Sequence, residues 1–311
     1  MRPIHVVMMT TAMAIWGSNL TVAKLGFHDI PPLFLVAARF IIGAAILCPF
    51  TRIRTDQVLP VAMVSVTFSL YFAFSYLGLS GIGAGTAAFL TQLQIPFAGI
   101  AAAVAFRERL TAAWLVGVLV ALAGTALVAA NASVSGDVWH VFLFILSALA
   151  WALAHLQVKR MRGIDALALN AYISLFAAAP MLGAAVLIEG TAAVVLRDPA
   201  MDAFVLAYQG LLVGVAAYAL WYAVVNRYPV RLTAPFTLVI PVFGVLTGVI
   251  FLGEPMQPMV VLGGAVTLLG ICLMLFRREG DTERFPASGT APSISSADAE
   301  GGVASRLTRR G

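Results

Sequence analysis

The sequence predicts an all-α integral membrane protein in which ten transmembrane helices form two inverted five-helix repeats around a central cavity. Composition is the first indication, because 61% of the 311 residues are hydrophobic and only 11% are charged. About a quarter of the residues in an ordinary water-soluble domain carry charge, and the mean hydropathy here is +0.97. The other two indications are a set of ten apolar segments and an internal repeat.

Ten apolar segments each approach the roughly 20 residues that an α-helix needs to cross a bilayer. In chain order they cover residues 4–26, 33–50, 58–78, 82–105, 110–130, 139–158, 166–188, 203–225, 231–252 and 257–276. Their hydrophobicity is continuous rather than alternating, which favours helices over the strands of a membrane barrel. The first segment lacks an Ala-x-Ala-like cleavage site and has a later counterpart, so we expect it to remain as a span.

Charge distribution orients these spans. Sixteen of the nineteen lysine and arginine residues lie before the first span, in every second connection or after the last span, and therefore on one side of the membrane. The positive-inside rule assigns that side to the cytoplasm. The sequence thus predicts a multi-pass protein of the cell inner (plasma) membrane with both termini in the cytoplasm.

The two halves of the chain repeat each other at a nearly constant offset. Pro96 in the fourth span recurs 145 residues later as Pro241 in the ninth, and Glu108 recurs 146 residues later as Glu254. Both prolines remove a backbone hydrogen bond in mid-span and are expected to bend their helices around a cavity. Both glutamates end their spans, and we expect each carboxylate to cap the helix that follows it.

The repeat also divides the chain. Each half has five spans, an odd number, so similar halves must cross the membrane in opposite directions. We expect the first repeat at residues 1–131 and the second at residues 137–277. Residues 278–311 are rich in small and charged residues, which predicts a disordered cytoplasmic tail.

The repeated residues resemble a known family. In the first half they are Ala14-Ile15-Trp16-Gly17-Ser18-Asn19, Arg39-Phe40, Ile95-Pro96, Arg107-Glu108-Arg109-Leu110, Gly117 and Gly124. In the second half they are Trp151, Ile240-Pro241, Gly253-Glu254-Pro255, Gly263 and Gly270. Over residues 5–276 this pattern resembles the EamA-type branch of the drug/metabolite transporter superfamily, and within it the exporters of aromatic amino acids.

The resemblance implies a carrier that exports small metabolites, commonly amino acids, through a central cavity formed by both repeats. The second half departs from the pattern in two ways. Glu254 lacks the basic neighbours of Glu108, and Ser174 occupies the place that Arg39 has in the first half. Whatever Arg39 does is therefore done once.

Two tryptophans at equivalent depths are candidate substrate-binding residues. Trp16 and Asn19 are three residues apart on one face of the first span, and Trp151 and His155 are four apart on the sixth. Packing alone can explain a tryptophan at mid-depth, but polar groups inside a bilayer are costly and tend to face a cavity. His155 is either a hydrogen-bonded core residue or a group that takes part in a proton-coupled step.

Intramembrane charge and aromatic residues complete the candidate site. Arg39 could hold a substrate carboxylate through a bidentate contact, or it could satisfy backbone carbonyls at a helix end. Phe72 and Tyr76 in the third span correspond to Tyr218 and Tyr222 in the eighth, and each pair shares a helix face that we expect to line the cavity. Gln92 in the fourth span either hydrogen-bonds a solute or ties helices together. Lys24, near the end of the first span, is a second charged candidate.

Several signatures are absent. No aspartate or glutamate lies at the centre of a predicted span, so ion coupling has no obvious carrier and facilitative transport is a full alternative to antiport. Metalloprotease, nucleotide-loop and nucleophile-elbow motifs are missing as well. We therefore expect no metal, no cofactor, no catalytic residue, no enzymatic activity and no nucleic-acid partner.

The sequence predicts a monomeric transporter that exports small metabolites, chiefly aromatic or hydrophobic amino acids, by alternating access. Its partners are a small-molecule solute and membrane lipid. One alternative is a proton-coupled exporter of drugs, quaternary cations or other metabolites. Another is an integral-membrane enzyme acting on lipid, which would need a cluster of acids or histidines where the chain has only scattered ones such as Asp198 and Asp202.

Overall fold

The computed structural model describes residues 1–107, 111–134, 138–161, 163–191, 194–225, 227–228 and 230–276, and every regular element within them is helical. Seven helical segments have the length and apolar composition to cross a bilayer, and three shorter apolar helices complete the predicted ten spans. The all-α membrane fold is thereby confirmed. The expected tail at residues 278–311 lies outside the described residues.

The first five spans match the predicted segments closely. They are α1 (Pro3–Gly26), α2 (Pro32–Leu47) with the 3-10 turn η1 (Cys48–Phe50), α3 (Thr55–Gly81), a segmented span made of α4 (Ala84–Leu90), η2 (Thr91–Leu93) and α5 (Gln94–Phe106), and α6 (Ala112–Val134). Proline occupies one of the first two positions of both α1 and α2, where its missing N–H costs nothing.

The second five spans follow the same plan. They are α7 (Val138–Arg160), α8 (Ala166–Ile188), a span made of α9 (Pro199–Ala207), the π-helical segment η4 (Tyr208–Ala216) and α10 (Ala217–Val225), a span made of α11 (Val230–Thr233), η5 (Ala234–Val239) and α12 (Ile240–Leu252), and α13 (Pro258–Phe276). Aspartate side chains accept backbone N–H groups at the starts of α8 and α9, at Asp165 and Asp198 respectively.

Proline interrupts the fourth and ninth spans at equivalent points. A 3-10 segment at 91–93 precedes Pro96, and a 3-10 segment at 234–239 leads up to Pro241. Proline cannot donate to the carbonyl four residues before it and its ring clashes with that carbonyl, so the preceding turn leaves α-helical geometry. Both spans therefore change helix type ahead of the proline, and the expected bend around a cavity stays a prediction.

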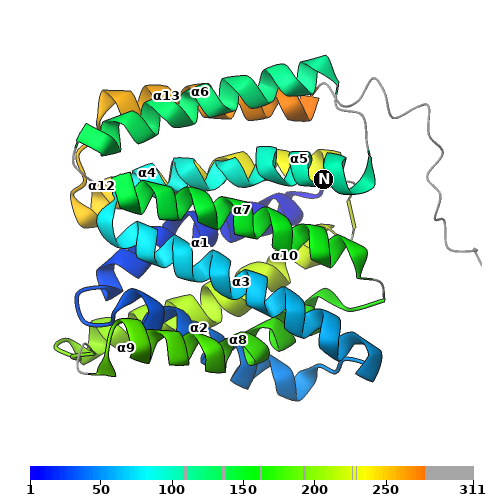
Figure 1. Cartoon of the computed structure of the whole chain (residues 1–311), viewed down its shortest axis with the longest axis vertical. Coiled ribbons are helices and arrows are strands. Elements are labelled where there is room, and N and C mark those ends of the chain that lie inside the picture. The colour runs from blue at the N-terminus through cyan, green and yellow to red at the C-terminus, as the bar shows by residue number, and fades with distance from the viewer. Residues whose placement is uncertain are drawn as a thin grey trace, which may run out of the picture. The chain divides into compact units, whose positions relative to one another are not determined.

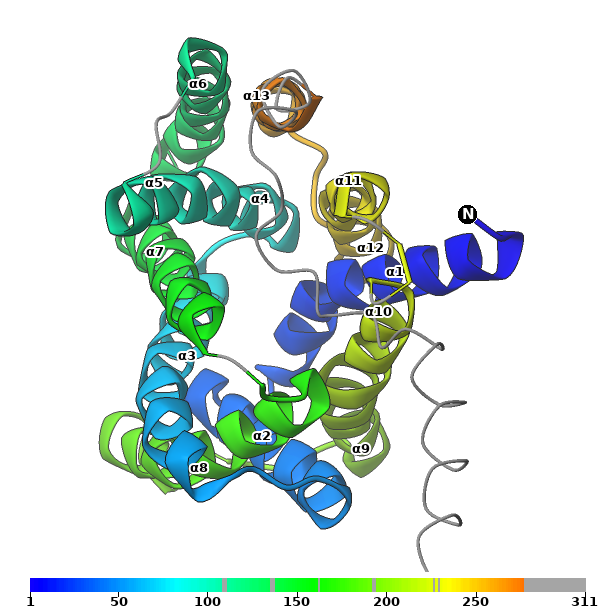
Figure 2. The ribbon, with the colours of Figure 1, turned by 90° about the vertical axis from the view of Figure 1, so that its right-hand side faces the viewer.

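Contacts between helices repeat when the halves are exchanged. α3 packs against α7, and in the same way α10 packs against α1, while α5 against α7 matches α12 against α1. The equivalent helices α2 and α8 contact each other directly, as do α6 and α13, and α4 of the fourth span contacts α12 of the ninth. Seen from the end that holds the N-terminus, α3, α5 and α7 lie on one side of the centre and α1, α10 and α12 on the other (Figure 2). This is the arrangement expected of inverted repeats.

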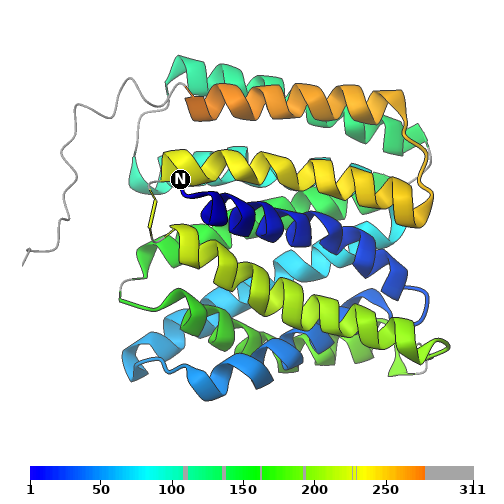
Figure 3. The same cartoon turned by 180° about the vertical axis from the view of Figure 1, so that it is seen from behind.

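Glycine brings α6 and α13 into close contact along their length (Figures 1 and 3). Gly117 and Gly124 on α6 are seven residues apart, as are Gly263 and Gly270 on α13, so each pair lies on one helix face. A Cβ at Gly263 would lie 2.7 Å from the carbonyl oxygen of Gly124, and one at Gly117 would lie 2.8 Å from that of Gly270. The backbones therefore approach as closely as glycine alone permits.

We expect Gly263→Ala to lower the free energy of unfolding by about 1–3 kcal/mol, because a backbone carbonyl cannot move aside for the added methyl group. Gly183→Ala on α8 is the matched control. No atom lies within 4 Å of a Cβ at Gly183, so this change should stabilise the helix by about 0.5–1 kcal/mol. Denaturant unfolding in detergent measures both, and equal signs for the two variants would contradict the close-packing explanation.

Candidate functional site

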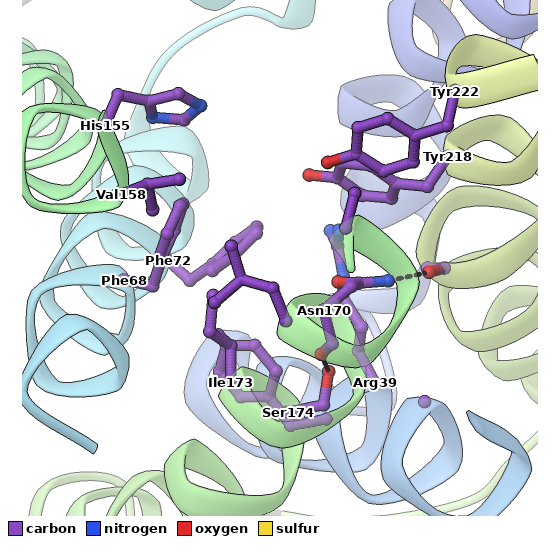
Figure 4. A pocket seen from close by; sticks show the side chains of 15 residues that line it. Arg39, Phe68, Phe72, His155, Val158, Asn170, Ile173, Ser174, Tyr218 and Tyr222 are labelled. Carbon is purple, nitrogen blue, oxygen red and sulfur yellow. Dashed lines mark hydrogen bonds between the residues drawn. The ribbon is translucent and has the colours of Figure 1, made fainter. Parts of the chain in front are cut away.

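A cavity lies among α2, α3, α7, α8, η4 and α10 and holds about 640 Å³ of empty space, part of it open to solvent (Figure 4). Its lining residues are Arg39, Phe40, Gly43, Phe68, Phe72, His155, Val158, Ala166, Leu169, Asn170, Ile173, Ser174, Gly214, Tyr218 and Tyr222. None of these fifteen residues is acidic. The cavity thus combines one permanent cation with a largely aromatic and aliphatic wall.

The cavity is nearer one end of the helix bundle than the other. Val158 lies in the last turn of α7, Ala166 begins α8, and Tyr222 lies in the last turn of α10. These helix ends lie with the N-terminus of the chain at the end of the bundle that faces the viewer in Figure 2. The cavity therefore approaches the surface at this end.

Arg39 is the charged residue of the cavity, and its side chain has few partners. It is only 6% exposed. Its Nη1 donates one long hydrogen bond of 3.5 Å to Tyr76 Oη, and the guanidinium carbon lies 4.4 Å from the centre of the Phe72 ring. Within the described part of the chain, neither a carboxylate nor a helix-end carbonyl pairs with it. An arginine buried in this way retains most of its five N–H donors for a ligand.

A chain of hydrogen bonds runs from Arg39 toward α1. Tyr76 is 1% exposed and donates to the side-chain oxygen of Gln209 at 2.8 Å. The amide nitrogen of Gln209 in turn donates to the backbone carbonyl of Asn19 at 3.3 Å. This chain holds Tyr76 in place beneath the guanidinium and joins α3, η4 and α1.

The two repeat-related tryptophans take different positions. Trp16 lies against Tyr218, with 5.2 Å between ring centres, and against Trp221 at 5.6 Å. Trp151 stacks on His155 at 3.6 Å. Neither tryptophan lines the cavity, but each supports an aromatic ring that does. They are therefore positioned to hold the walls.

His155 faces the cavity from α7 (Figure 4). Its Nδ1 lies 3.1 Å from the carbonyl oxygen of Trp151. A carbonyl can only accept, so Nδ1 carries the hydrogen and Nε2 of the neutral ring remains an acceptor. The side chain can therefore accept one hydrogen bond from within the cavity.

Five of the ten residues predicted from the sequence line the cavity, and the other five lie in contact with its walls or deeper in the bundle. The lining five are Arg39, Phe72, His155, Tyr218 and Tyr222. Asn19 and Gln92 each have a buried side-chain atom without a hydrogen-bond partner among the described residues, Oδ1 and Nε2 respectively. Such atoms are costly unless a ligand or water satisfies them.

Asn170 is a polar lining residue that the predicted site left out, as is Ser174. It lies one turn before Ser174 on the same face of α8, and both line the cavity. An asparagine one turn from a serine on an otherwise apolar helix was the available signal. Its hydrogen bond to Gly214, 44 residues away, could not be predicted from the sequence.

The opposite end of the bundle is held together by charged groups. Lys24 Nζ donates to Glu254 Oε1 at 3.1 Å and to the carbonyl of Ile82 at 2.9 Å. The two oxygens of Glu254 also accept the backbone N–H groups of Ala84 and Gly85, at 2.7 and 3.2 Å. Lys24 is therefore paired and takes no part in the cavity.

These contacts correct the expected role of Glu254. The carboxylate was expected to cap the following span, but it caps the start of α4, in the other repeat. The reason is that α12 packs directly against α4, so the N-terminus of α4 is the nearest set of free N–H groups. Its counterpart Glu108 lies outside the described residues.

Two further carboxylates tie loops together at this end. Asp29 accepts the backbone N–H groups of Arg197 and Asp198 at 3.0 and 3.2 Å. A hydrogen bond from His28, together with these N–H groups, holds the pKa of Asp29 below its ordinary value against the opposing effect of burial. Glu189 accepts the N–H groups of Leu33 and Phe34 at the start of α2, although burial raises its pKa. The α1–α2 and α8–α9 connections are thus fixed to each other.

Among the described residues, no group of three or more histidine, cysteine, aspartate or glutamate side chains could hold a metal ion. The carboxylates lie mainly at helix ends and in loops, where several of them accept backbone N–H groups. The chemistry that the cavity offers is binding, through one cation, several neutral hydrogen-bonding groups and aromatic rings.

Known proteins resemble this chain over most of its length. It is 27% identical to a probable amino-acid metabolite efflux pump of Salmonella typhimurium, and 26% identical to one of Escherichia coli, over 85% of this chain and 92% of each relative. An uncharacterized inner membrane transporter of Escherichia coli is 26% identical over 92% of this chain and 94% of its own length.

One solved crystal structure has the same fold, with a TM-score of 0.63 and 23% identity over 90% of this chain and all of the other. The EamA-like transporter family matches twice, at residues 3–130 and 138–276. These two matches together take in nearly all of the helical part of the chain. Ten apolar spans, a cavity among the helices and this double match lead to one conclusion: the chain belongs to the EamA-like transporter family.

Proposed function

We propose that this membrane transporter exports small amino-acid metabolites, chiefly aromatic and hydrophobic amino acids, from the cytoplasm by alternating access. The observation that carries the proposal is Arg39, a buried cation that lines the cavity without an acidic partner among the described residues. An unbalanced charge at this depth is costly, by several kcal/mol, and a solute carboxylate would balance it. A planar guanidinium suits a carboxylate because two parallel N–H groups match its two oxygens.

The walls of the cavity favour an apolar side chain on the solute. Phe68 and Phe72 from α3 face Tyr218 and Tyr222 from α10 across the cavity (Figure 4). Aromatic walls with a few converging polar groups are typical of small-molecule sites. Two relatives named as probable amino-acid metabolite efflux pumps point to the same class of solute.

The distribution of charge supports an orientation of the protein in the membrane and a state in which the cavity opens toward the cytoplasm. We place the protein in the cell inner membrane with both termini in the cytoplasm. The cavity approaches the surface at the end of the bundle that holds the N-terminus, so it approaches the cytoplasmic surface. The opposite end is closed by Lys24 and Glu254. Rocking of the repeats at 1–131 and 137–277 about their shared contacts would exchange the open and closed ends. The cavity lining contains no acidic side chain that could carry a coupling ion. Facilitative movement needs no such carrier and is therefore the proposed mechanism.

One other solute class and one other mechanism fit the cavity less well. A quaternary cation would meet Arg39 with no carboxylate in the lining to offset the repulsion. A proton-coupled mechanism would rely on His155, which is the titratable ring of the lining with an ordinary pKa nearest neutrality. His155 therefore marks the alternative that a proton gradient would reveal.

Counterflow in proteoliposomes tests the proposal. Vesicles loaded with unlabelled phenylalanine should accumulate labelled phenylalanine and tryptophan, and the rate should not depend on an imposed proton gradient. A labelled quaternary cation that does not cross lipid by itself, such as tetraethylammonium, should not exchange. Movement of the quaternary cation without any exchange of amino acids would overturn the proposal, and a strict need for a proton gradient would replace the facilitative mechanism with a coupled one.

A further inference from the structure

Asn170 is held in one orientation by the backbone of the neighbouring span. Its side-chain nitrogen Nδ2 donates to the carbonyl oxygen of Gly214 at 2.7 Å. A carbonyl can only accept a hydrogen bond, so the amide nitrogen must be the atom on that side. The amide oxygen Oδ1 consequently points away from Gly214, toward the interior of the cavity (Figure 4).

The carbonyl that fixes Asn170 belongs to an unusual segment. Gly214 lies in η4, where residues 208–216 are π-helical, a geometry that is rare and concentrated at functional sites. The equivalent span of the first repeat, α3, is a continuous α-helix in the described structure. The contact between Asn170 and Gly214 is therefore a feature of one repeat alone, like Arg39.

The amide oxygen of Asn170 is available to a ligand. No described residue donates a hydrogen bond to it, and it is not among the polar atoms sealed inside the protein. Ser174, one turn further along α8, has its hydroxyl committed to the backbone carbonyl of Asn170 at 2.9 Å. Asn170 thus adds an unpaired amide oxygen to this wall, beside the Ser174 hydroxyl oxygen, which can also accept.

Asn170 and Arg39 lie on helices that touch. A Cβ at Gly43, one turn from Arg39 on α2, would lie 3.2 Å from the hydroxyl oxygen of Ser174 on α8. One cavity therefore presents a cation from α2 and a neutral oxygen acceptor from α8. Asp165, the carboxylate nearest in sequence, uses Oδ2 to cap α8 and is not part of the lining.

We infer that Oδ1 of Asn170 accepts a hydrogen bond from the ammonium group of the solute and so makes the cavity selective for free α-amino acids over acids that lack the amino group. This inference rests on the proposed function, because it requires Arg39 to hold the carboxylate of the same molecule. The ammonium group then meets a fixed neutral acceptor in place of a carboxylate. A neutral acceptor binds the ammonium group less strongly than a carboxylate would, so the solute is released from the cavity at a lower cost in free energy.

The test compares two ligands on the purified transporter in detergent. Phenylalanine and 3-phenylpropanoate share the ring and the carboxylate and differ in the amino group. We expect the wild-type protein to bind phenylalanine about tenfold more tightly, the size of effect of one hydrogen bond to a charged group. Asn170→Leu, which keeps the number and branching of the side-chain heavy atoms, should remove this preference by weakening phenylalanine binding while leaving 3-phenylpropanoate binding unchanged.

Control variants separate the possible outcomes. Ser174→Ala also changes a lining residue and should keep the tenfold preference. If Asn170→Leu weakens both ligands, Asn170→Ala decides: equal weakening of both ligands there as well overturns the inference. Loss of the preference in His155→Leu instead of Asn170→Leu would assign the amino group to α7 and overturn it too. If wild-type protein binds neither ligand, the proposed function falls and the inference falls with it, whereas equal binding of both overturns the inference alone.

Discussion

Arg39→Gln is expected to lower the affinity for phenylalanine and 3-phenylpropanoate alike by about a hundredfold, since both lose a bidentate, charge-assisted contact of about 3 kcal/mol. Arg39→Lys keeps the charge but lacks the planar guanidinium group, so its affinity for both ligands should lie between those of Arg39→Gln and the wild type. Equilibrium binding to purified protein and counterflow in proteoliposomes measure the loss. A structural role for Arg39 predicts a different pattern, in which stability falls together with affinity.

The stability of Arg39→Gln therefore carries as much information as its affinity. The variant loses one 3.5 Å hydrogen bond to Tyr76 and a ring contact with Phe72, but it also removes an unpaired buried charge. Removing a buried charge without a partner relieves its desolvation cost. We expect the free energy of unfolding to stay level or rise. Arg54→Gln, an exposed arginine paired with Asp56, is the control and should leave binding unchanged.

Full affinity in Arg39→Gln would place the carboxylate elsewhere and remove the main support for the proposed function. A large fall in stability with partly retained affinity would instead assign Arg39 to packing. The double substitution Arg39→Gln with Asn170→Leu adds a further check. Because the two residues are expected to hold opposite ends of one solute, 3-phenylpropanoate should bind the double variant as weakly as Arg39→Gln alone.

Glu254→Gln is expected to lower the free energy of unfolding by about 2–3 kcal/mol, near the lower end for breaking a buried ion pair. The side chains of Lys24 and Glu254 are 24% and 19% exposed, so solvent screens part of the interaction. The variant removes the negative charge that balances the Lys24 cation and weakens the cap on α4. Denaturant unfolding in detergent measures the change.

Glu189→Gln is the matched control for this prediction. Glu189 also accepts two backbone N–H groups at a helix start, those of Leu33 and Phe34, but no lysine of the described part of the chain pairs with it. Loss of a cap alone costs about 1 kcal/mol, so the control should be milder. Lys24→Met combined with Glu254→Gln should recover part of the loss, because it removes the unpaired cation. Equal losses in Glu254→Gln and Glu189→Gln would show that the ion pair contributes nothing.

Much of the fold could be predicted because the bilayer restricts a chain so strongly. Each span must be long enough to cross and must satisfy its own backbone, which makes hydropathy a sufficient guide to the helices. The two prolines are an example of a structural feature that the sequence predicts. Pro96 and Pro241 were expected to bend their spans by removing a backbone hydrogen bond, and both spans change helix type just ahead of the proline. A missing N–H and a steric clash within one helical turn cause this change, so it can be predicted from the sequence alone.

Roles that depend on a second helix were harder to predict. Glu254 was expected to cap a helix, and it does, but the helix is α4 rather than the next one along the chain. A carboxylate caps the nearest free N–H groups in space, and that neighbour is set by the packing of α12 on α4. Asn170 was missed for the same reason, since its contact is with a carbonyl of η4.

The sequence by itself determined that this chain is a ten-helix membrane protein of inverted repeats, with one unrepeated arginine inside the membrane. These features follow from apolar length, charge placement and the odd number of spans in each half, all of which are properties of the chain read in order. Only the tertiary structure decided which polar side chains meet in one cavity and which end of the bundle that cavity approaches. Both depend on the rotation of each helix about its axis, which is fixed by packing between side chains far apart in sequence.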